Sequence, residues 1–309
     1  MRSRFILSLV CTLAGIIMLD GCATFQPPMP VIDPPRSVTA KPFPIGVKPV
    51  ALVLSGGSAR GFAHIGILKV LEEQGLKPDI IVGTSAGSIV GALYASGLTV
   101  SELASALAQL DKSVFTDFVM PNLGFLPGEM GFVRGDKLHR FIDARLKQHH
   151  IQDFPIRFAA VTTDLNTGKP VAFNSGDAGL AVVASCAVPG MIMPVEINRH
   201  RYGDGQISSP LPVSIARALG AKVVIAVDVV YPPEDAFLNS TVSVLFQAFT
   251  ISVYRIKEYE AANADLVIKP DLGKTAGQMT FGDRERLIAA GEAAMREVLP
   301  AVKKLFRPY

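Results

Sequence analysis

A serine between two glycines lies at positions 83–87, where the chain reads Gly-Thr-Ser-Ala-Gly. The pattern G-x-S-x-G is typical of a sharp strand-to-helix turn that lifts a nucleophilic serine out of a sheet. Gly83 and Gly87 fit that turn, because side chains there would collide with the neighbouring strand and helix. The apolar run 80–82 before the motif and the helical pattern 86–96 after it supply the required context. We therefore predict Ser85 as a nucleophile.

A glycine-rich turn covers residues 55–61, directly after the apolar run 50–54. Such a turn directs backbone N–H groups to one spot beside the positive end of a helix, which suits a negative charge. A nucleotide phosphate is disfavoured, because Phe62 and Ala63 stand where a P-loop needs Lys and Ser or Thr. Two interpretations remain: an oxyanion hole for acyl transfer, or a turn that only packs a helix tightly. Arg60 either holds this turn in shape or adds positive potential.

A serine nucleophile needs a base, and histidine is a common one. The chain has five histidines, which are His64, His139, His149, His150 and His200. We expect His64 to pack within a helix and the next three to lie on an exposed surface. An α/β-hydrolase triad places its histidine in a late loop, but no histidine occurs in the 109 residues after His200. A histidine base is therefore disfavoured.

An aspartate between two glycines offers another base. Asp204 follows the short apolar stretch 194–197, and the glycine at 205 allows close backbone approach. A carboxylate beside the serine can take its proton directly if burial raises the carboxyl pKa. Taken by itself, Asp204 fits an ordinary turn residue better than a base. A catalytic role requires the fold to bring it to Ser85, 119 positions earlier in the chain.

Short apolar runs alternate with helical patterns from residue 50 onward. Strands are predicted at 50–54, 80–82, 158–162, 223–229 and 266–268, and helices at 62–74, 86–96, 138–147, 215–219 and 284–298. This alternation predicts an α/β fold with three layers, α/β/α, around a mostly parallel central sheet. Chemistry in such folds lies at the carboxyl ends of the strands. We expect one domain over residues 50–309.

Four ordered blocks resemble the patatin-like phospholipases, most closely bacterial members related to neuropathy target esterase. The blocks are residues 55–66, the elbow at Ser85, residues 184–190 (Ala-Ser-Cys-Ala-Val-Pro-Gly), and Asp204 with Gly205. The likeness is dense over residues 50–229. Two positions depart from the family pattern: Ser58 stands where a third glycine is common, and Gln206 follows Asp204-Gly205 in place of Gly or Ala.

The resemblance implies a patatin-like fold and hydrolysis of fatty-acyl esters of phospholipids or lysophospholipids. It implies a Ser85–Asp204 dyad without histidine, and residues 184–190 as a wall of the site. The oxyanion hole implied by the resemblance comprises Gly56, Gly57 and Ser58. Two alternatives remain open: an acyltransferase that uses the same dyad, and a catalytically inactive lipid-binding module. The supporting residues are expected to be Arg60, Gly83, Gly87 and Gly205.

The amino-acid composition excludes several other classes of protein. The chain of 309 residues is 49% hydrophobic and 18% charged with net charge +3, which excludes disorder for most of its length and gives no basic footprint for nucleic acid. Cys11, Cys22 and Cys186 show neither a pairing pattern nor metal-ligand spacing. No acidic calcium loop or histidine cluster is present in the sequence. We therefore expect no metal and no cofactor.

The first fifty residues predict a lipoprotein. Residues 1–21 carry two arginines and then an apolar stretch, as a secretory signal does. The end, Leu19-Asp20-Gly21-Cys22, resembles a bacterial lipobox in which Cys22 receives lipid, and Ala23 resembles the sorting signal for the outer membrane, facing the periplasm. The alternative is an uncleaved N-terminal anchor. The following segment, residues 22–49, is expected to be an extended tether, because eight prolines disfavour helix and sheet.

Two apolar stretches complete the sequence pattern. Residues 114–132 are rich in Phe, Met, Leu and Gly, which predicts either a flap over an acyl pocket or an irregular loop packed on the core. Residues 242–254 are apolar enough to lie on a membrane or another subunit, whereas their Ser, Thr and Gln residues argue against a membrane span. Most helices of this kind belong to a protein core.

Overall fold

The central sheet is formed by short apolar runs with both faces buried. The computed structural model describes residues 33–119, 130–233, 238–273 and 281–307. In β1 (Val50–Leu54), Leu52 and Leu54 join the core on one face of the sheet, whereas Ala51 and Val53 join the core on the other. Side chains alternate across a strand, so a strand covered on both sides is apolar at every position.

One mixed sheet of eight strands is present in the described ranges, in the order β5-β6-β3-β2-β1-β7-β8, with β4 also paired to β3. The strands from β3 to β8 in this order are parallel, whereas β4, β5 and β6 are antiparallel additions that the sequence did not predict. The bounds are β2 (Ile80–Thr84), β3 (Arg157–Asp164), β4 (Pro170–Phe173), β5 (Val195–Ile197), β6 (His200–Asp204), β7 (Val223–Val227) and β8 (Leu266–Ile268).

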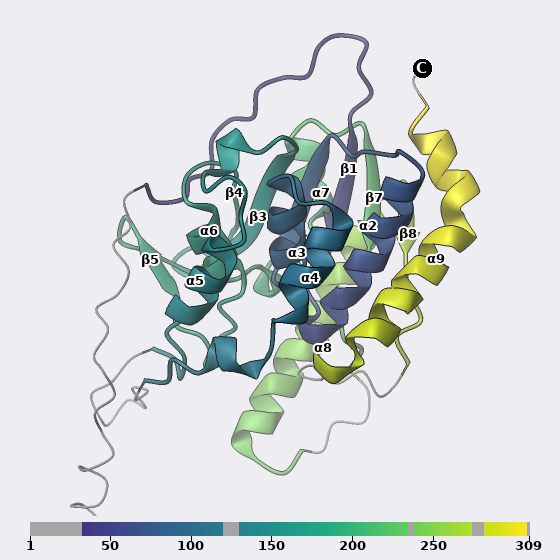
Figure 1. Ribbon diagram of the computed structural model, residues 1–309. Helices are drawn as coiled ribbons and strands as arrows, with labels where there is room; N and C mark the ends of the chain where they lie inside the picture. The colour runs from purple at the N-terminus through teal and green to yellow at the C-terminus, as the bar shows by residue number, and fades with distance from the viewer. Residues whose placement is uncertain (1–32, 120–129, 234–237, 274–280, 308–309) are drawn as a thin grey trace, which may run out of the picture. The chain divides into compact units, whose positions relative to one another are not determined.

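Helices cover both faces of this sheet, which confirms the predicted α/β class (Figure 1). One face carries α2 (Ala63–Glu73), α3 (Ala86–Ala95), α4 (Val100–Ala108), α5 (Asp136–Asp143), α6 (Ala178–Ser185) and α9 (Arg284–Leu305). The opposite face carries α7 (Val213–Ala218) and the end of α8 (Thr241–Ala261). The short 3-10 turns in the chain include η1 (Ser58–Phe62), η2 (Lys112–Phe115) and η4 (Gly205–Ile207).

Helix α9 is longer than predicted. The sequence pattern predicted its end at residue 298, and Pro300 lacks a backbone donor, which disfavours a helix interior. The helix instead continues through Pro300 to Leu305. Val302 in the added turn is fully buried in the core, so apolar packing outweighs the missing hydrogen bond.

Part of the predicted tether packs against the domain. The amide of Arg36 donates to the carbonyl of Ser175 (2.8 Å), and the Val38 amide donates to the Asn174 side chain (2.8 Å). The compact unit of the chain accordingly runs Ile32–Tyr309. Residues 36–38 of the expected tether therefore pair their backbone with a loop of the domain. The signal segment 1–21 and Cys22 lie outside the described residues.

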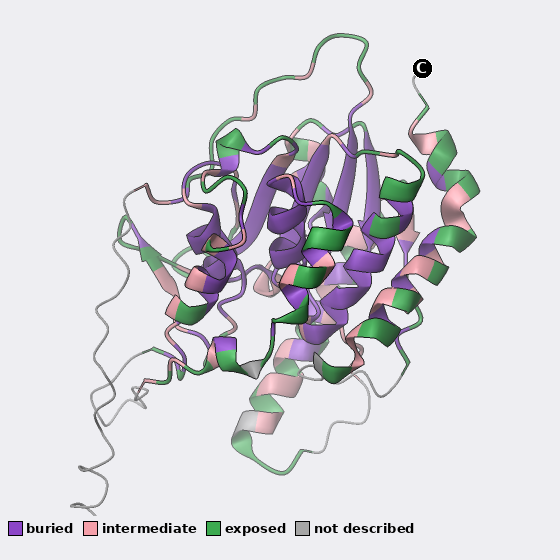
Figure 2. Cartoon of the chain, viewed as in Figure 1, coloured by how far each residue is buried: buried purple, intermediate pink, exposed green. Residues whose placement is uncertain are grey.

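Helix α8 differs from the core helix that its apolar sequence suggested. Its second half is attached to the domain, with Val253 and Lys257 buried. Its first half extends past the edge of the sheet (Figures 1 and 2). In this half, Val244 and Leu245 are 50% and 66% exposed. Among the described residues, no helix combines the length and the apolar character that crossing a membrane requires.

Candidate active site

Ser85 occupies a strained turn between β2 and α3. Its backbone has φ 52° and ψ −122°, in a region that residues with a Cβ rarely adopt. A Cβ on Gly83 would collide with the carbonyl oxygen of Gly87, and a Cβ on Gly87 would collide with that of Leu54 in β1. Both glycines are therefore required by close packing, as the motif predicts. The turn presents the Ser85 hydroxyl at the carboxyl end of the strand.

Strand register brings Asp204 to this turn. Thr84, the last residue of β2, pairs with Val161 of β3, and the next residue of β3, Thr162, pairs with Asp204 at the end of β6. The Ser85 Oγ donates a hydrogen bond to Asp204 Oδ2 at 2.8 Å. The two residues thus meet across β3 although 119 positions separate them. Asp204 ends a strand, where the sequence had suggested a loop.

The Asp204 carboxyl is completely buried. Its Oδ1 accepts from the Gln206 amide (2.8 Å), its own amide donates to the Ala187 carbonyl (2.8 Å), and Thr163 Oγ1 donates to its carbonyl (2.9 Å). Burial raises the pKa of Asp204 to about 7, against the opposing effect of the Gln206 and Ser85 hydrogen bonds. A carboxyl with that pKa exchanges protons near neutral pH, as a general base must.

The glycine-rich turn lies beside the elbow because Leu54 pairs with Gly83 at the ends of β1 and β2. The Gly56 amide donates to the Pro210 carbonyl (3.2 Å) and is therefore engaged elsewhere. Gly57 precedes η1 and Ser58 begins it, where amides have no partner within the helix. Ser58 has φ 51°, in the region that favours glycine, which accounts for the glycine common there in the resembling family.

Arg60 and His64 hold this turn from behind. Arg60 is buried, and its Nε donates to the Val229 carbonyl at 3.2 Å. His64 is also buried, and its Nε2 donates to the Ser55 carbonyl at 2.9 Å, since a carbonyl can only accept. Burial lowers the pKa of His64 to about 4, so the ring is neutral. These contacts agree with a packed His64 and with Arg60 as a holder of the turn.

The other histidines lie away from the serine. His200 is 48% exposed at its side chain, and its Nδ1 contacts Asp164 Oδ2 at 2.9 Å. His139 was expected on the surface, and this is wrong: it is buried, with Nε2 3.2 Å from Asp177 Oδ1. Asp177 caps α6, so His139 completes the capping contact at the start of that helix.

Ser185 is a site residue that the sequence did not single out beyond its block at 184–190. Its hydroxyl accepts the Ser85 amide at 2.9 Å and donates to the Val161 carbonyl at 2.5 Å. The bond therefore fixes the strained backbone of Ser85 to β3. No spacing rule predicts such a contact, because the two serines are 100 positions apart and meet only through the sheet.

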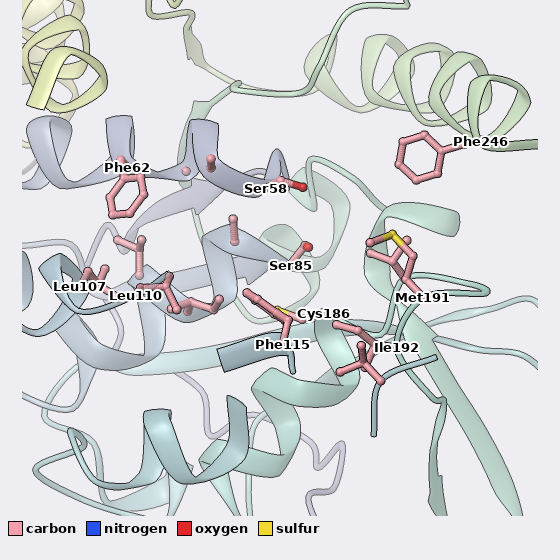
Figure 3. Close-up of a pocket in the computed structure, with 17 residues that line it drawn as sticks. Ser58, Phe62, Ser85, Leu107, Leu110, Phe115, Cys186, Met191, Ile192 and Phe246 are labelled. Atoms are coloured by element: carbon pink, nitrogen blue, oxygen red, sulfur yellow. The ribbon is translucent and has the colours of Figure 1, made fainter. Parts of the chain in front are cut away.

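An apolar cavity of about 130 Å³ opens over Ser85 (Figure 3). Phe62, Leu107 and Leu110 lie at its buried end, and Phe246 and Met191 lie at the other end, where Met191 is 41% exposed. The rest of the lining is Ser58, Ala59, Gly61, Ser85, Ala86, Ile89, Val90, Phe115, Val133, Cys186, Val188 and Ile192. Of the predicted flap 114–132, Phe115 contributes to the lining, and residues 120–129 lie outside the described ranges.

Within the ranges that the structure describes, no group of three or more His, Cys, Asp or Glu side chains is arranged to hold a metal ion. Cys186 is buried beside the site, with its Sγ 3.9 Å from the Ser88 hydroxyl. Burial raises the pKa of the Cys186 thiol well above its usual value. The thiol is therefore protonated at neutral pH.

Comparison with known proteins gives concordant results. An uncharacterized NTE family protein of Mycobacterium tuberculosis is 34% identical over 62% of this chain and 53% of its own length. A protein named lysophospholipase NTE1 in Coccidioides immitis is 35% identical over 59% of this chain and 12% of its own length. The crystal structure of VipD from Legionella pneumophila has a TM-score of 0.50 at 13% identity, covering 90% of this chain and 72% of VipD, which supports the fold alone.

The chain thus spans about half the length of the mycobacterial relative, and a small part of the fungal one. The family model for patatin-like phospholipases matches residues 52–217, more than half of the chain. That range contains the glycine-rich turn, the elbow and Asp204. The chain belongs to the patatin-like phospholipase family.

Proposed function

We propose that the protein is a serine acyl hydrolase, a phospholipase A, lysophospholipase or esterase, that cleaves fatty-acyl esters with Ser85 and Asp204. One observation carries the proposal: the Ser85 hydroxyl lies 2.8 Å from the buried Asp204 carboxyl at the floor of an apolar cavity. The name of the fungal relative, lysophospholipase, agrees with this reaction class.

The reaction begins when the Asp204 carboxylate takes the Ser85 proton and Oγ attacks the ester carbonyl carbon. The amides of Gly57 and Ser58 are the proposed donors to the resulting oxyanion, with Gly56 in a supporting position because its amide is engaged. Collapse of the intermediate breaks the ester C–O bond, and Asp204 returns the proton to the leaving alcohol. A water molecule, deprotonated by Asp204, then attacks the acyl carbonyl carbon; the bond between Ser85 Oγ and this carbon breaks, the fatty acid leaves, and Asp204 returns the proton to Oγ.

The apolar lining of the cavity fits an acyl group. The acyl chain would occupy the buried end at Phe62, Leu107 and Leu110, where apolar side chains replace water around it. The alcohol or headgroup portion would extend past Phe246 and Met191 toward solvent. This orientation places the scissile ester near the middle of the cavity, above Ser85.

Variants at the two proposed catalytic residues test the function. Ser85→Ala and Asp204→Asn should each lower turnover of a lysophospholipid by at least about a thousandfold, with the fold retained. His200→Ala is the matched control and should keep near-normal turnover, because His200 contacts Asp164 and not Ser85. A fluorophosphonate probe should label the native protein and not Ser85→Ala. An inactive His200→Ala together with an active Asp204→Asn would refute the dyad.

We also propose that the protein is a lipoprotein attached to the outer membrane through Cys22, facing the periplasm. The support is the sequence of residues 1–23 alone. Labelling of cells with radioactive palmitate should mark the native chain. The Cys22→Ser variant should incorporate no label.

A further inference from the structure

We infer that the cavity opens through a rim that inserts into the surface of a lipid bilayer. The rim comprises exposed apolar residues on two sides of the opening: Val244 and Leu245 on α8, and Phe118, Phe132 and Met191 on the opposite side. This inference rests on the proposed function and adds that the protein takes its substrate from a lipid bilayer.

The first part of the argument is continuity. Phe246 and Met191 line the cavity, while Leu245, next to Phe246, is 66% exposed and Met191 itself is 41% exposed. The apolar lining therefore continues over both edges of the opening onto the outer surface. On the Met191 side, the Phe132 amide donates to the Met191 carbonyl (2.9 Å), which joins Phe132 to the same edge.

The second part is charge. Residues 241–254 of α8 contain no Asp, Glu, Lys or Arg, whereas the next turns carry Arg255, Lys257, Glu258 and Glu260. A helix half without charge that leaves several apolar side chains in water is costly unless another apolar phase covers it. A protein partner seated there would close the route by which a lipid reaches Ser85. A bilayer would cover the rim and supply the substrate together.

The third part is anchorage. Lys257 Nζ forms a buried ion pair with Asp228 Oδ2 at 2.9 Å, and Glu260 accepts the Leu211 amide at 2.8 Å. The second half of α8 is thereby fixed to the ends of the central strands. The uncharged half extends beyond this attachment to the edge of the cavity, at the lower side of the sheet in Figures 1 and 2. The fold thus holds the rim in place rather than leaving it on a loose loop.

The absence of tryptophan from the chain permits a direct test. Single tryptophans are introduced into the full-length Ser85→Ala protein as Leu245→Trp, Phe132→Trp or Tyr259→Trp. Tyr259, 79% exposed on the charged half of the same helix, is the matched control. Phosphatidylcholine vesicles with and without bromine on the acyl chains serve as the membrane. Because Ser85→Ala cannot turn over lipid, this readout is independent of the proposed catalytic function.

On addition of vesicles, the Leu245→Trp and Phe132→Trp emissions should shift to the blue and lose about half their intensity with brominated lipid, as expected for an interfacial position. Tyr259→Trp should change little, even when the N-terminus holds the protein on the vesicle. Equal quenching at all three positions, or quenching at none, would overturn the inference. So would a blue shift without lipid that grows with protein concentration, because the rim would then be covered by a second copy of the chain.

Discussion

The elbow and the first half of α8 border the same cavity, yet their side chains are held differently. Ser85 and Asp204 are buried, and each has hydrogen bonds to neighbouring strands or loops. Val244 and Leu245 are half or more exposed and lie in a helix half that extends beyond the domain. At the elbow, the strained backbone fixes the position of Ser85. At the first half of α8, the role of the exposed side chains would depend on the surface that they contact.

The difference shows which parts of a site leave a local mark in the sequence. A strained turn requires glycines at fixed spacing, so the elbow at residues 83–87 can be predicted from the sequence. An exposed apolar helix half needs only residues of one class, and that composition also occurs in buried helices. This difference can be tested with substitutions of two kinds: those that disturb the backbone near Ser85, and those that change only exposed side chains of α8.

The largest effect is expected at Gly87. A Cβ in Gly87→Ala would collide with the Leu54 carbonyl, and the neighbouring strand cannot move without disturbing β1. We expect a loss of about 3 kcal/mol or more in the free energy of unfolding, measured by urea titration, together with loss of fluorophosphonate labelling. Gly282→Ala is the control, because a Cβ at that position would have no other atom within 4 Å. Comparable losses in both variants would contradict the packing argument.

The next effect concerns the pH dependence of turnover. The base form of Asp204 is the carboxylate, and burial raises the pKa of this group to about 7. Activity should therefore rise with pH through about 7 and fall about tenfold per unit below it, reaching about one hundredth near pH 5. The measurement is kcat/KM of a soluble ester between about pH 5 and 9. A profile that is flat down to about pH 5 would exclude Asp204 as the base.

The same group predicts a change in stability. The folded pKa of Asp204, about 7, lies above its ordinary value of 3.8, so its favourable contribution is present below about pH 4 and is lost as pH rises through 7. Asp204→Asn removes the charge; the amide oxygen can still accept from the Gln206 amide, and the amide NH2 can donate to the Ser85 hydroxyl in place of accepting from it. It should therefore be more stable than the native protein at about pH 8, by on the order of 2 kcal/mol, with the gain vanishing near pH 4.

Asp228→Asn supplies the contrast to this result. Asp228 is paired with Lys257 at 2.9 Å in the interior, and removing one charge leaves the other unpaired. Thermal unfolding at about pH 8 should show Asp228→Asn destabilised while Asp204→Asn is stabilised. Destabilisation of both variants would mean that the Asp204 charge is compensated in the fold.

A smaller effect is expected at Ser185, a positioning residue. Ser185→Ala leaves the Ser85 amide and the Val161 carbonyl without their shared partner. We expect kcat to fall about tenfold with KM nearly unchanged, because the proposed nucleophile Ser85 is less well fixed while the cavity keeps its shape. Ser88→Ala is the control: its hydroxyl bonds the Ser85 carbonyl, but the Ser88 amide still bonds that oxygen. Equal losses of kcat would contradict the specific role of Ser185.

Much of the scaffold follows from local pattern. The apolar runs at 50–54 and 266–268 coincide with β1 and β8, and the helix after Ser85 begins and ends within a residue of its predicted bounds. The antiparallel strands β5 and β6 were missed, because three to five half-exposed residues carry little periodicity. Those strands nevertheless carry Asp204 to the site.

The residues of the site also differ in how well the sequence predicts them. Ser85 and the glycine-rich turn can be predicted from the sequence, because backbone geometry restricts the residue types at these positions. The contacts of Ser185 and His139, and the lining by Phe246, depend on long-range packing that one sequence does not encode in any spacing. The engaged amide of Gly56 is likewise a tertiary fact, since its acceptor is the carbonyl of Pro210.

The smallest effect on stability is expected for a substitution on the exposed face of α8. It tests most directly whether the two halves of this helix differ. Leu245→Ser changes a side chain that is 66% exposed, so unfolding of the protein in water should shift by less than about 0.5 kcal/mol. Val253→Ser, two turns further along the same helix and 2% exposed, should cost about 2 kcal/mol because it buries a hydroxyl in place of apolar atoms. Urea titrations of the two variants measure the difference. Equal destabilisation would mean that Leu245 already contributes to the fold in water, and the two halves of α8 would then not differ in the way their exposure indicates.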